Sequence, residues 1–332
     1  MDPIEDSAKC RGLSLLSGGL DSQLAVKVLQ DAGAYVEGVT FSTPFFSPGA
    51  ARRAAAQLGV KLHVIDFTDD EISLIESPPH GFGGAMNPCI DCHAKMISRA
   101  GELMSALGFD FVATGEVLGQ RPMSQQRGPL NRVRNLSGAG GRLLRPLCAK
   151  HLDPTEPEIL GLVDRERLLD LQGRNRKPQM ELARKFGIRD YPAPAGGCKL
   201  TEPNYCRRLK NLMAHEGLGD ARLLEACNHG RHFRLPGGTL VVLGRDRADN
   251  EYLRTAMRGG DAVLRSVNVP GPTALAVRPA AADEAALRRL IAAYADHRGV
   301  DTIVVRESRP AAPAVEHPMP VSSRDEFAPY LL

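Results

Sequence analysis

Short apolar runs and helix-like repeats alternate along the first part of the chain. Each apolar run is long enough for one buried strand, and each repeat places apolar residues three or four positions apart, as one buried helix face requires. The sequence predicts strands at residues 12–17, 34–41, 60–67 and 109–115, and helices at residues 22–32, 48–59 and 92–108. Strands that alternate with helices at this spacing form a parallel sheet covered on both faces. We therefore expect an α/β fold with a doubly wound parallel sheet.

The rest of the chain has less regular patterns. Residues 68–91, rich in Pro and Gly, and residues 116–145 are expected to be loops, the first of them long enough to be functional. Near residue 225 a second composition begins, with short apolar runs and a helix at 283–297, which indicates a smaller α+β module. The Pro-rich end is expected to be loosely ordered. The expected domains are residues 1–220 and 221–309, with a tail at 310–332.

Composition excludes some classes of protein. The 332 residues are 43% apolar, which suffices for the cores of two domains. A formal net charge of +3 is too small to imply nucleic-acid binding by itself. No apolar run is long enough to span a membrane, and the N-terminus lacks the basic and apolar segments of a secretory signal. We expect a cytoplasmic protein with no membrane partner.

The joint between the first strand and the first helix reads SGGLDS. A glycine-rich turn before a helix is an anion site, because free N–H groups and the helix dipole favour phosphate there. Gly18 and Gly19 allow a ligand to approach the backbone, and Ser17 and Ser22 offer hydroxyl groups. Asp21 either caps the helix or holds Mg²⁺. The GxxxxGK[ST] motif of kinases and GTPases is absent, and a simple helix-capping turn is the alternative without a ligand.

Seven cysteines are present, an odd number that argues against a disulfide framework. Cys89 and Cys92 form a CxxC at a helix start, and Cys198 follows two glycines that permit close approach. Three cysteines with an open fourth position suit an iron–sulfur cluster. A persulfide and disulfide pair, a zinc site completed by His93, and plain packing are the alternatives, with Cys206 as a weaker third cysteine.

Arginines gather in two segments. Six lie between residues 121 and 145 with no acidic residue among them, and Arg176 and Lys177 belong to a second basic group. Arginines near a nucleotide site clamp phosphates of ATP or RNA, whereas a solvated surface is the plain alternative. We favour phosphate contact for both segments.

Six motifs occur in a fixed order: SGGLDS, NPCIDC, DFVATGE, LLRPL, GRNRKPQMELA and PAPAGGCKLT. This series resembles the tRNA-thiolating branch of the PP-loop ATP pyrophosphatase family, the tRNA 2-thiouridine and 4-thiouridine synthases. The resemblance implies an adenine nucleotide alpha hydrolase-like fold. It assigns ATP contacts to Ser17, Gly18, Gly19, Asp21, Ser22, Phe41, Thr114 and Gly115, with Arg176 and Lys177 close to the GRNRK motif.

The resemblance also implies a reaction. Members of this branch adenylate a uridine carbonyl with ATP and Mg²⁺, release pyrophosphate and replace the oxygen with sulfur, which gives 2- or 4-thiouridine and AMP. The cluster-dependent type holds a [4Fe-4S] cluster by three cysteines, here Cys89, Cys92 and Cys198. The implied partners are tRNA and a sulfur donor (sulfide or a sulfur carrier), and a homodimer is compatible with the sequence. Glu116 stands where the usual motif has His, and His93 where many relatives have Asn, which bears on the target uridine.

The segment VVLGRDRADNEYL, residues 241–253, resembles the RNA-binding domain of NFACT-type proteins. Gly244, Arg245, Asn250 and Leu253 carry this likeness, and an ordinary strand, turn and helix is the alternative. Three rival functions stay open: a metal-free persulfide-based tRNA thiolase, an amidating PP-loop ligase that acts on a small molecule, and a non-catalytic RNA-binding protein.

Overall fold

The computed structural model describes residues 10–121, 124–193 and 197–332. The chain divides into two compact units, Met1–Thr201 and Glu202–Leu332. In the described part, no helix is both long and apolar enough to cross a membrane.

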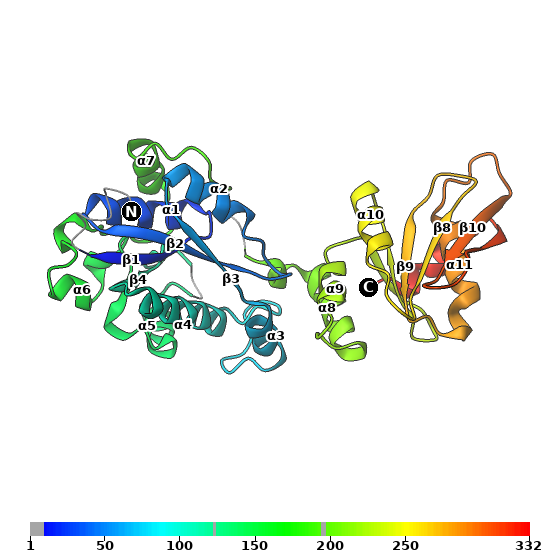
Figure 1. The fold of residues 1–332 in the computed structure, drawn as a ribbon, viewed down its shortest axis with the longest axis horizontal. Coiled ribbons are helices and arrows are strands. Elements are labelled where there is room, and N and C mark those ends of the chain that lie inside the picture. Colours follow the sequence, from blue (N-terminus) through cyan, green and yellow to red (C-terminus); the bar gives the residue numbers. More distant parts are fainter. Residues whose placement is uncertain (1–9, 122–123, 194–196) are drawn as a thin grey trace. The chain divides into compact units, whose positions relative to one another are not determined.

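The first unit contains a five-stranded parallel sheet with the strand order β3-β2-β1-β4-β5 (Figure 1). The strands are β1 (Arg11–Leu15), β2 (Tyr35–Ser42), β3 (Leu62–Asp66), β4 (Phe111–Ala113) and β5 (Leu143–Leu144). Gly12 of β1 is needed for packing, because a Cβ there would lie 2.3 Å from the ring of Phe111. That ring is fully buried at the centre of the unit.

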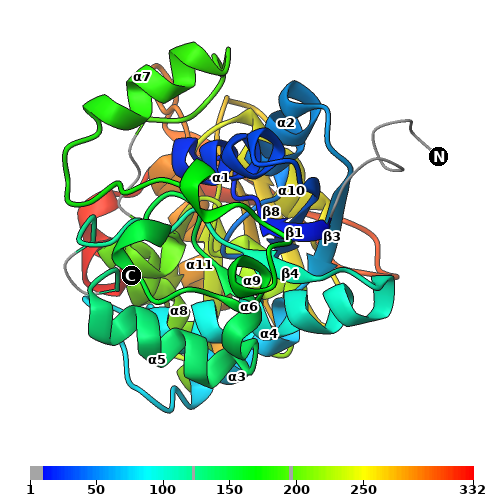
Figure 2. The same ribbon diagram turned by 90° about the vertical axis from the view of Figure 1, so that its left-hand side faces the viewer.

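Helices cover both faces of this sheet, so the predicted doubly wound α/β fold is confirmed (Figure 1 and Figure 2). One face carries α1 (Leu20–Asp31), α2 (Gly49–Leu58) and α7 (Lys177–Lys185), and the other carries α3 (Thr68–Glu76), α4 (Cys89–Leu107) and α5 (Arg127–Ser137). Leu24 of α1 and Ile97 of α4 are buried in the two resulting cores. The short elements of this unit are η1 (Gly140–Arg142), η2 (Ala149–His151), α6 (Glu156–Ile159), η3 (Arg165–Arg167) and η4 (Lys199–Thr201).

Two of the expected loops contain helices. Within residues 68–91 lies α3, whose first turn holds Asp69, Asp70 and Glu71. Three carboxylates near a helix N-terminus interact favourably with the helix dipole. The apolar pattern alone does not reveal this stabilisation, so the helix was not predicted. Residues 116–145 contain α5, which buries few apolar side chains and is otherwise polar. Such a sparse apolar pattern does not distinguish a helix from a loop.

The second unit is an antiparallel six-stranded sheet with the order β11-β10-β8-β9-β7-β6. Its strands are β6 (Arg231–Arg234), β7 (Leu240–Leu243), β8 (Ala262–Ser266), β9 (Thr273–Val277), β10 (Thr302–Ser308) and β11 (Val315–Pro320). Its helices are α8 (Pro203–His215), α9 (Ala221–Ala226), α10 (Arg247–Thr255), α11 (Glu284–Tyr294), η5 (Ala281–Asp283) and η6 (Arg324–Tyr330). Leu290 and Ile291 of α11 pack with Phe233 and Ile303 of the sheet in one core.

The second unit begins and ends differently from the expected domains. Helix α8 belongs to it, because Arg234 of β6 donates hydrogen bonds to Asn211 and to Glu216. The expectation of a loosely ordered tail is wrong, since β11 pairs with β10 along six residue pairs. Pro318 and Pro320 are tolerated in β11 because it is an edge strand, where a missing N–H need not break a ladder.

Candidate functional site

The glycine-rich turn follows the carboxyl end of β1. Gly18 has a φ of 85°, and a Cβ there would lie 2.5 Å from the backbone of Ala50, so a larger residue does not fit. Ser22 donates a hydrogen bond to the carbonyl oxygen of Gly19 at 2.8 Å, and Ser17 donates to Ser22 at 3.2 Å. Gly19 is the N-cap of α1 and has no side chain to cap it. The helix N-terminus therefore has free donors for an anion.

Asp21 lies in the first turn of α1. Gln120 donates to its Oδ2 at 3.0 Å, while Oδ1 is buried and has no hydrogen bond within the residues that the structure describes. Burial raises the pKa of Asp21, and the hydrogen bond from Gln120 and the charges of Arg176 and Arg121 oppose this rise. An unpartnered carboxylate oxygen in this position fits one ligand of a hard cation such as Mg²⁺.

The end of β4 lies directly against this turn. A Cβ on Gly115 would lie 2.6 Å from the backbone of Asp21 and Ser22, so the close approach requires glycine. Thr114 donates from its hydroxyl to Glu116 at 3.0 Å. Phe41, at the end of β2, is 5% exposed and packs edge to face on Phe67. Its ring faces the core in this arrangement.

A basic residue at the start of α7 acts on the same turn. Arg176 is the N-cap of α7, half-buried, and its charge acts on Asp21. Its Nε is buried without a hydrogen bond in the described part of the chain. Lys177 is exposed at the first position of α7. The charge of Arg176 therefore acts at the turn, where a bound phosphate would need it.

The three cysteines come from two distant segments. Cys89 and Cys92 occupy the first turn of α4, and Cys198 precedes η4. The backbone N–H of Met86 donates to the carbonyl oxygen of Leu200 at 3.1 Å and ties the two segments together. The charges of Cys198 and Cys89 contribute to the pKa of Cys92, so the three sulfur atoms lie within electrostatic reach of one another.

A carboxyl group that the sequence did not reveal contacts this trio. Cys92 donates its thiol hydrogen to Oε2 of Glu71 at 3.1 Å, and both groups are buried. Burial, followed by the charge of Glu71, raises the pKa of Cys92 well above its ordinary value. Burial also raises the pKa of Cys198 to about 11. Both thiols are therefore protonated at neutral pH.

This arrangement tests the expected cluster ligands. Among the described residues, no three His, Cys, Asp or Glu side chains are grouped so that they could hold a metal ion. The three thiols supply the right kind of donor, but Cys92 is engaged with Glu71 and Asn87 donates to the sulfur of Cys89 at 3.1 Å. As they lie, the thiols do not fit an iron–sulfur cluster.

A buried ion pair connects the turn to the cysteines. Arg145 donates from Nε to Glu116 at 2.8 Å, and both side chains are buried. Burial acts to raise the pKa of Glu116, but the charges and hydrogen bonds of Arg145 and His93 together outweigh it and hold the pKa far below its usual range. The other carboxylate oxygen lies 3.6 Å from Nδ1 of His93, the residue after Cys92. The two positions that depart from the family pattern are thus each other's neighbours.

Sequence reasoning singled out Glu116 and His93 without predicting their contact. It missed Glu71 and Arg145 as partners, although Arg145 lies in the LLRPL motif. Glu71 lies in none of the sequence motifs described above.

Two family models match the chain. Residues 7–151 match the family described as thiamine biosynthesis protein (ThiI), and residues 230–327 match the NFACT protein RNA binding domain. These ranges coincide with most of the two compact units.

Curated relatives agree with the first match. The tRNA-specific 2-thiouridylase MnmA of Roseiflexus castenholzii is 28% identical over 264 residues, which are 70% of this chain and 68% of the relative. The protein of the same name from Chloroflexus aurantiacus is 28% identical over 81% of this chain and 75% of its own. That from Sulfurimonas denitrificans is 34% identical, but only over 31% of this chain and 33% of its own.

Solved structures match more distantly. A 4-thiouridine synthetase in complex with RNA and bound ATP is 21% identical with a TM-score of 0.38, covering 65% of this chain and 52% of that one. The C-terminal part of the fibronectin/fibrinogen-binding protein from Streptococcus suis is 12% identical with a TM-score of 0.26, covering 39% of this chain and 67% of that one. From the family models and the relatives together, the first domain is similar to the matched ThiI family and to the tRNA-specific 2-thiouridylases, and the second is similar to the NFACT RNA-binding domain.

Proposed function

We propose that this chain is an ATP-dependent tRNA sulfurtransferase, which adenylates a uridine carbonyl and replaces its oxygen with sulfur. The observation that carries this proposal is the contact between Glu116 and His93. Glu116 follows Gly115, which abuts the phosphate-binding turn, and His93 follows Cys92. This contact makes the glycine-rich turn and the thiols neighbours, which supports a single site for adenylation and sulfur transfer. The names of the relatives, tRNA-specific 2-thiouridylases, support tRNA as the substrate.

ATP would bind with its phosphates on the turn of residues 17–22, with Arg176 and Lys177 adding positive charge. Thr114 and Gly115 would border the nucleotide, while Phe41 supports the strand end from the core. Asp21 Oδ1 fits one ligand of Mg²⁺, whose chemistry there is to neutralise the leaving pyrophosphate. The fixed turn, with its free N–H groups, stabilises charge that develops on the phosphate oxygens.

The first chemical step joins uridine to AMP. The carbonyl oxygen attacks the α-phosphorus, an O–P bond forms, and the bond to pyrophosphate breaks. The oxygen thereby becomes part of a good leaving group. The protein contributes mainly positioning and electrostatic stabilisation to this step.

The second step delivers sulfur from a cysteine persulfide. The terminal sulfur, carried by Cys92 or Cys198, attacks the activated carbon, and AMP leaves with the former carbonyl oxygen. The other cysteine then attacks the inner sulfur, which releases thiouridine and leaves a disulfide. Sulfide attacks this disulfide and regenerates one persulfide and one thiolate. Alternatively, a thiol reductant reduces the disulfide, and a carrier persulfide then transfers its outer sulfur to one of the two thiols and leaves as a thiol. Glu71 is placed to take the proton of Cys92 when that thiol reacts.

The [4Fe-4S] cluster that the resemblance implies has no step in this scheme, because the thiols as they lie do not fit it. If bound, it would be held by Cys89, Cys92 and Cys198. Measuring the iron content of the purified protein separates the cluster route from the persulfide route. All seven cysteines are free thiols, which suits the reducing cytoplasm that we propose as the compartment. The named groups come from a single chain, so a homodimer is not required for the chemistry.

The test uses anaerobically purified protein with unmodified tRNA and Mg-ATP. A low-molecular-weight persulfide supplies the sulfur, because sulfide alone cannot convert a free thiol into a persulfide, and a parallel sample receives sulfide only. Nucleosides from digested tRNA are examined by mass spectrometry, and bound iron is measured on the same sample. We expect a thiouridine whose retention time names the 2- or 4-isomer, and its loss in Cys92→Ala and Cys198→Ala. Cys206→Ala, which removes a buried thiol from α8 of the other unit, is the matched control.

Other outcomes support the rivals. Release of AMP and pyrophosphate without any thionucleoside would contradict the uridine assignment and favour a small-molecule ligase. Absence of ATP turnover with intact RNA binding would favour a non-catalytic RNA-binding protein. A thionucleoside that requires four irons per chain would overturn the persulfide route.

A further inference from the structure

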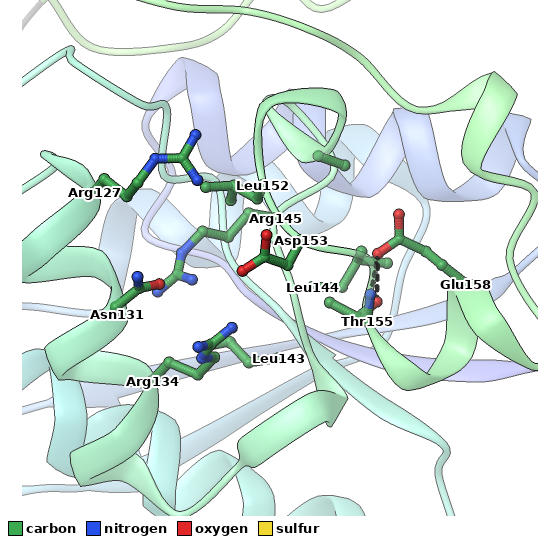
Figure 3. Close-up of a pocket in the computed structure, with 11 residues that line it drawn as sticks. Arg127, Asn131, Arg134, Leu143, Leu144, Arg145, Leu152, Asp153, Thr155 and Glu158 are labelled. Carbon is green, nitrogen blue, oxygen red and sulfur yellow. Dashed lines mark hydrogen bonds between the residues drawn. The ribbon is translucent and has the colours of Figure 1, made fainter.

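A pocket lies beside the proposed site, between α5 and the segment that follows β5. It is a shallow depression that is open to solvent, with an enclosed volume of only about 20 Å³. Arg127, Asn131 and Arg134 line it from α5, and Asp153 and Thr155 line the opposite wall (Figure 3). None of these five residues has a part in the ATP or sulfur steps proposed above.

The α5 wall is built from one helix face. Positions 127, 131 and 134 are four and three residues apart, which places their side chains on the same side of the helix. Arg127 is fixed by a hydrogen bond from its guanidinium to the carbonyl oxygen of His151 at 2.7 Å. The guanidinium of Arg134 has no hydrogen bond or ion pair within the described part of the chain. Helix α5 contains no acidic residue to balance these charges.

The floor of the pocket is rigid. Arg145 lines it and is 4% exposed. Its Nε is bound to Glu116 and another guanidinium nitrogen donates to the carbonyl oxygen of Leu130 at 3.1 Å. The positive charge of Arg145 is therefore already matched by Glu116. The charges left for a ligand are those of Arg127 and Arg134.

The opposite wall offers one unused acceptor. Glu158 accepts hydrogen bonds from the backbone and hydroxyl of Thr155 and pairs with Arg165, so its charge is satisfied. Asp153 is exposed, and within the described residues its carboxylate has neither a hydrogen bond nor an ion pair. A matching ligand carries an anion at one end and a hydrogen-bond donor at the other.

We propose that one nucleotide unit of the RNA substrate docks on this shallow pocket, with its phosphate and ribose against the lining side chains and its base outside. A backbone phosphate would lie on Arg127 and Arg134, and the ribose 2′-hydroxyl would donate to Asp153. The proposal rests on the function proposed above and extends it. Arg145 contributes both to the pocket floor and to the Glu116 ion pair, so a phosphate held here lies one arginine side chain from the reaction site. Anchoring the RNA there would set the position of the uridine.

The test measures binding of unmodified tRNA to the full chain as a function of salt. We expect Arg134→Gln to weaken tRNA binding about fivefold and to lower the salt slope by about one counterion, because one phosphate contact is lost. Arg134→Lys, which keeps the charge, should recover most of the affinity. Arg132→Gln removes the same charge from an exposed position of α5 outside the pocket, and we expect less than about a twofold loss.

A second measurement tests the 2′-hydroxyl. Asp153→Asn should reduce the preference for tRNA over an all-deoxy strand of the same sequence, since the carboxylate is the stronger acceptor. Equal losses in Arg134→Gln and Arg132→Gln would overturn the proposal in favour of general surface charge. Binding of inorganic phosphate that is lost in Arg134→Gln, together with an unchanged tRNA affinity of this variant, would assign the pocket to free phosphate instead. Because all these readouts are binding constants, they stand apart from the thionucleoside assay that tests the proposed reaction.

Discussion

Glu71 of α3 accepts the thiol hydrogen of Cys92 at 3.1 Å, although the two residues are separated by 21 positions in the sequence. Through this hydrogen bond, the Cys92 thiol and the Glu71 carboxylate share one proton. The carboxylate keeps the thiol protonated at rest and is the nearest group to receive its proton.

Replacing Glu71 should make Cys92 more reactive. In Glu71→Gln the negative charge is gone, so the pKa of Cys92 falls, and alkylation at neutral pH rises about tenfold for each unit of that fall. Peptide mass spectrometry after a timed iodoacetamide pulse measures the rate at this residue. Glu76→Gln, at the exposed end of the same helix, is the control. Equal rates in wild type and Glu71→Gln would show that the carboxylate does not govern the thiol.

Asp21 is expected to govern ATP cleavage. Asp21→Asn removes the buried, unpartnered oxygen that fits a cation, and we expect AMP release to fall about a hundredfold because leaving-group charge is no longer neutralised. Removal of Mg²⁺ with a chelator should have the same effect on wild type and little on the variant. Asp31→Asn, at the far end of α1, should retain activity. Full activity of Asp21→Asn would remove this residue from the reaction.

Gly115 is expected to tolerate no side chain. In Gly115→Ala the new Cβ would lie 2.6 Å from the backbone of Asp21, which must shift at a cost of about 1–3 kcal/mol. The phosphate-binding turn moves with it, so ATP turnover should fall strongly. The loss should exceed what the small decrease in the free energy of unfolding would explain. Gly101→Ala, where nothing lies within 4 Å of the added Cβ, should stabilise α4 by up to about 1 kcal/mol. Urea unfolding and AMP release, measured on both variants, check the contrast.

The ion pair between Glu116 and Arg145 is expected to be costly to break. Glu116→Gln leaves a buried guanidinium without its counter-charge, and the free energy of unfolding should fall by about 3 kcal/mol. Glu316→Gln breaks the exposed pair with Arg306 on the second sheet and should cost less than about 1 kcal/mol. Denaturant titrations of both variants compare the two values. Similar losses would mean that the buried pair contributes no more than a surface pair.

The second domain should lose stability in mild acid. Burial, and then the charge of Arg208, lowers the pKa of His232 from 6.5 to about 4. The folded state therefore favours the neutral imidazole, and its contribution is fully present above pH 6.5. It is lost as the pH falls from 6.5 through 4, with a limit of about 3 kcal/mol. Urea unfolding at several pH values should show a smaller loss in His232→Gln than in wild type.

Local patterns determined most of the fold. The strands and helices of the first unit follow from apolar spacing, because a side chain faces the core at every second position in a strand and at every third or fourth in a helix. The glycine-rich turn was also readable, since Gly18 adopts a φ of 85° that other residues rarely adopt. Helices α3 and α5 could not be predicted in this way. Acidic residues at its first turn stabilise α3, and only a few apolar side chains of α5 are buried, so neither has a clear apolar stripe.

Only the tertiary structure decided which side chains meet. The sequence by itself named the turn, the cysteines, Glu116 and His93, but not the contacts of Cys92 with Glu71 or of Glu116 with Arg145. The pocket on α5 was equally hidden, because its walls are separate in sequence and join only when β5 pairs with β4. The physical reason is that local spacing fixes which face a residue occupies, whereas the register and order of the strands fix which faces come together.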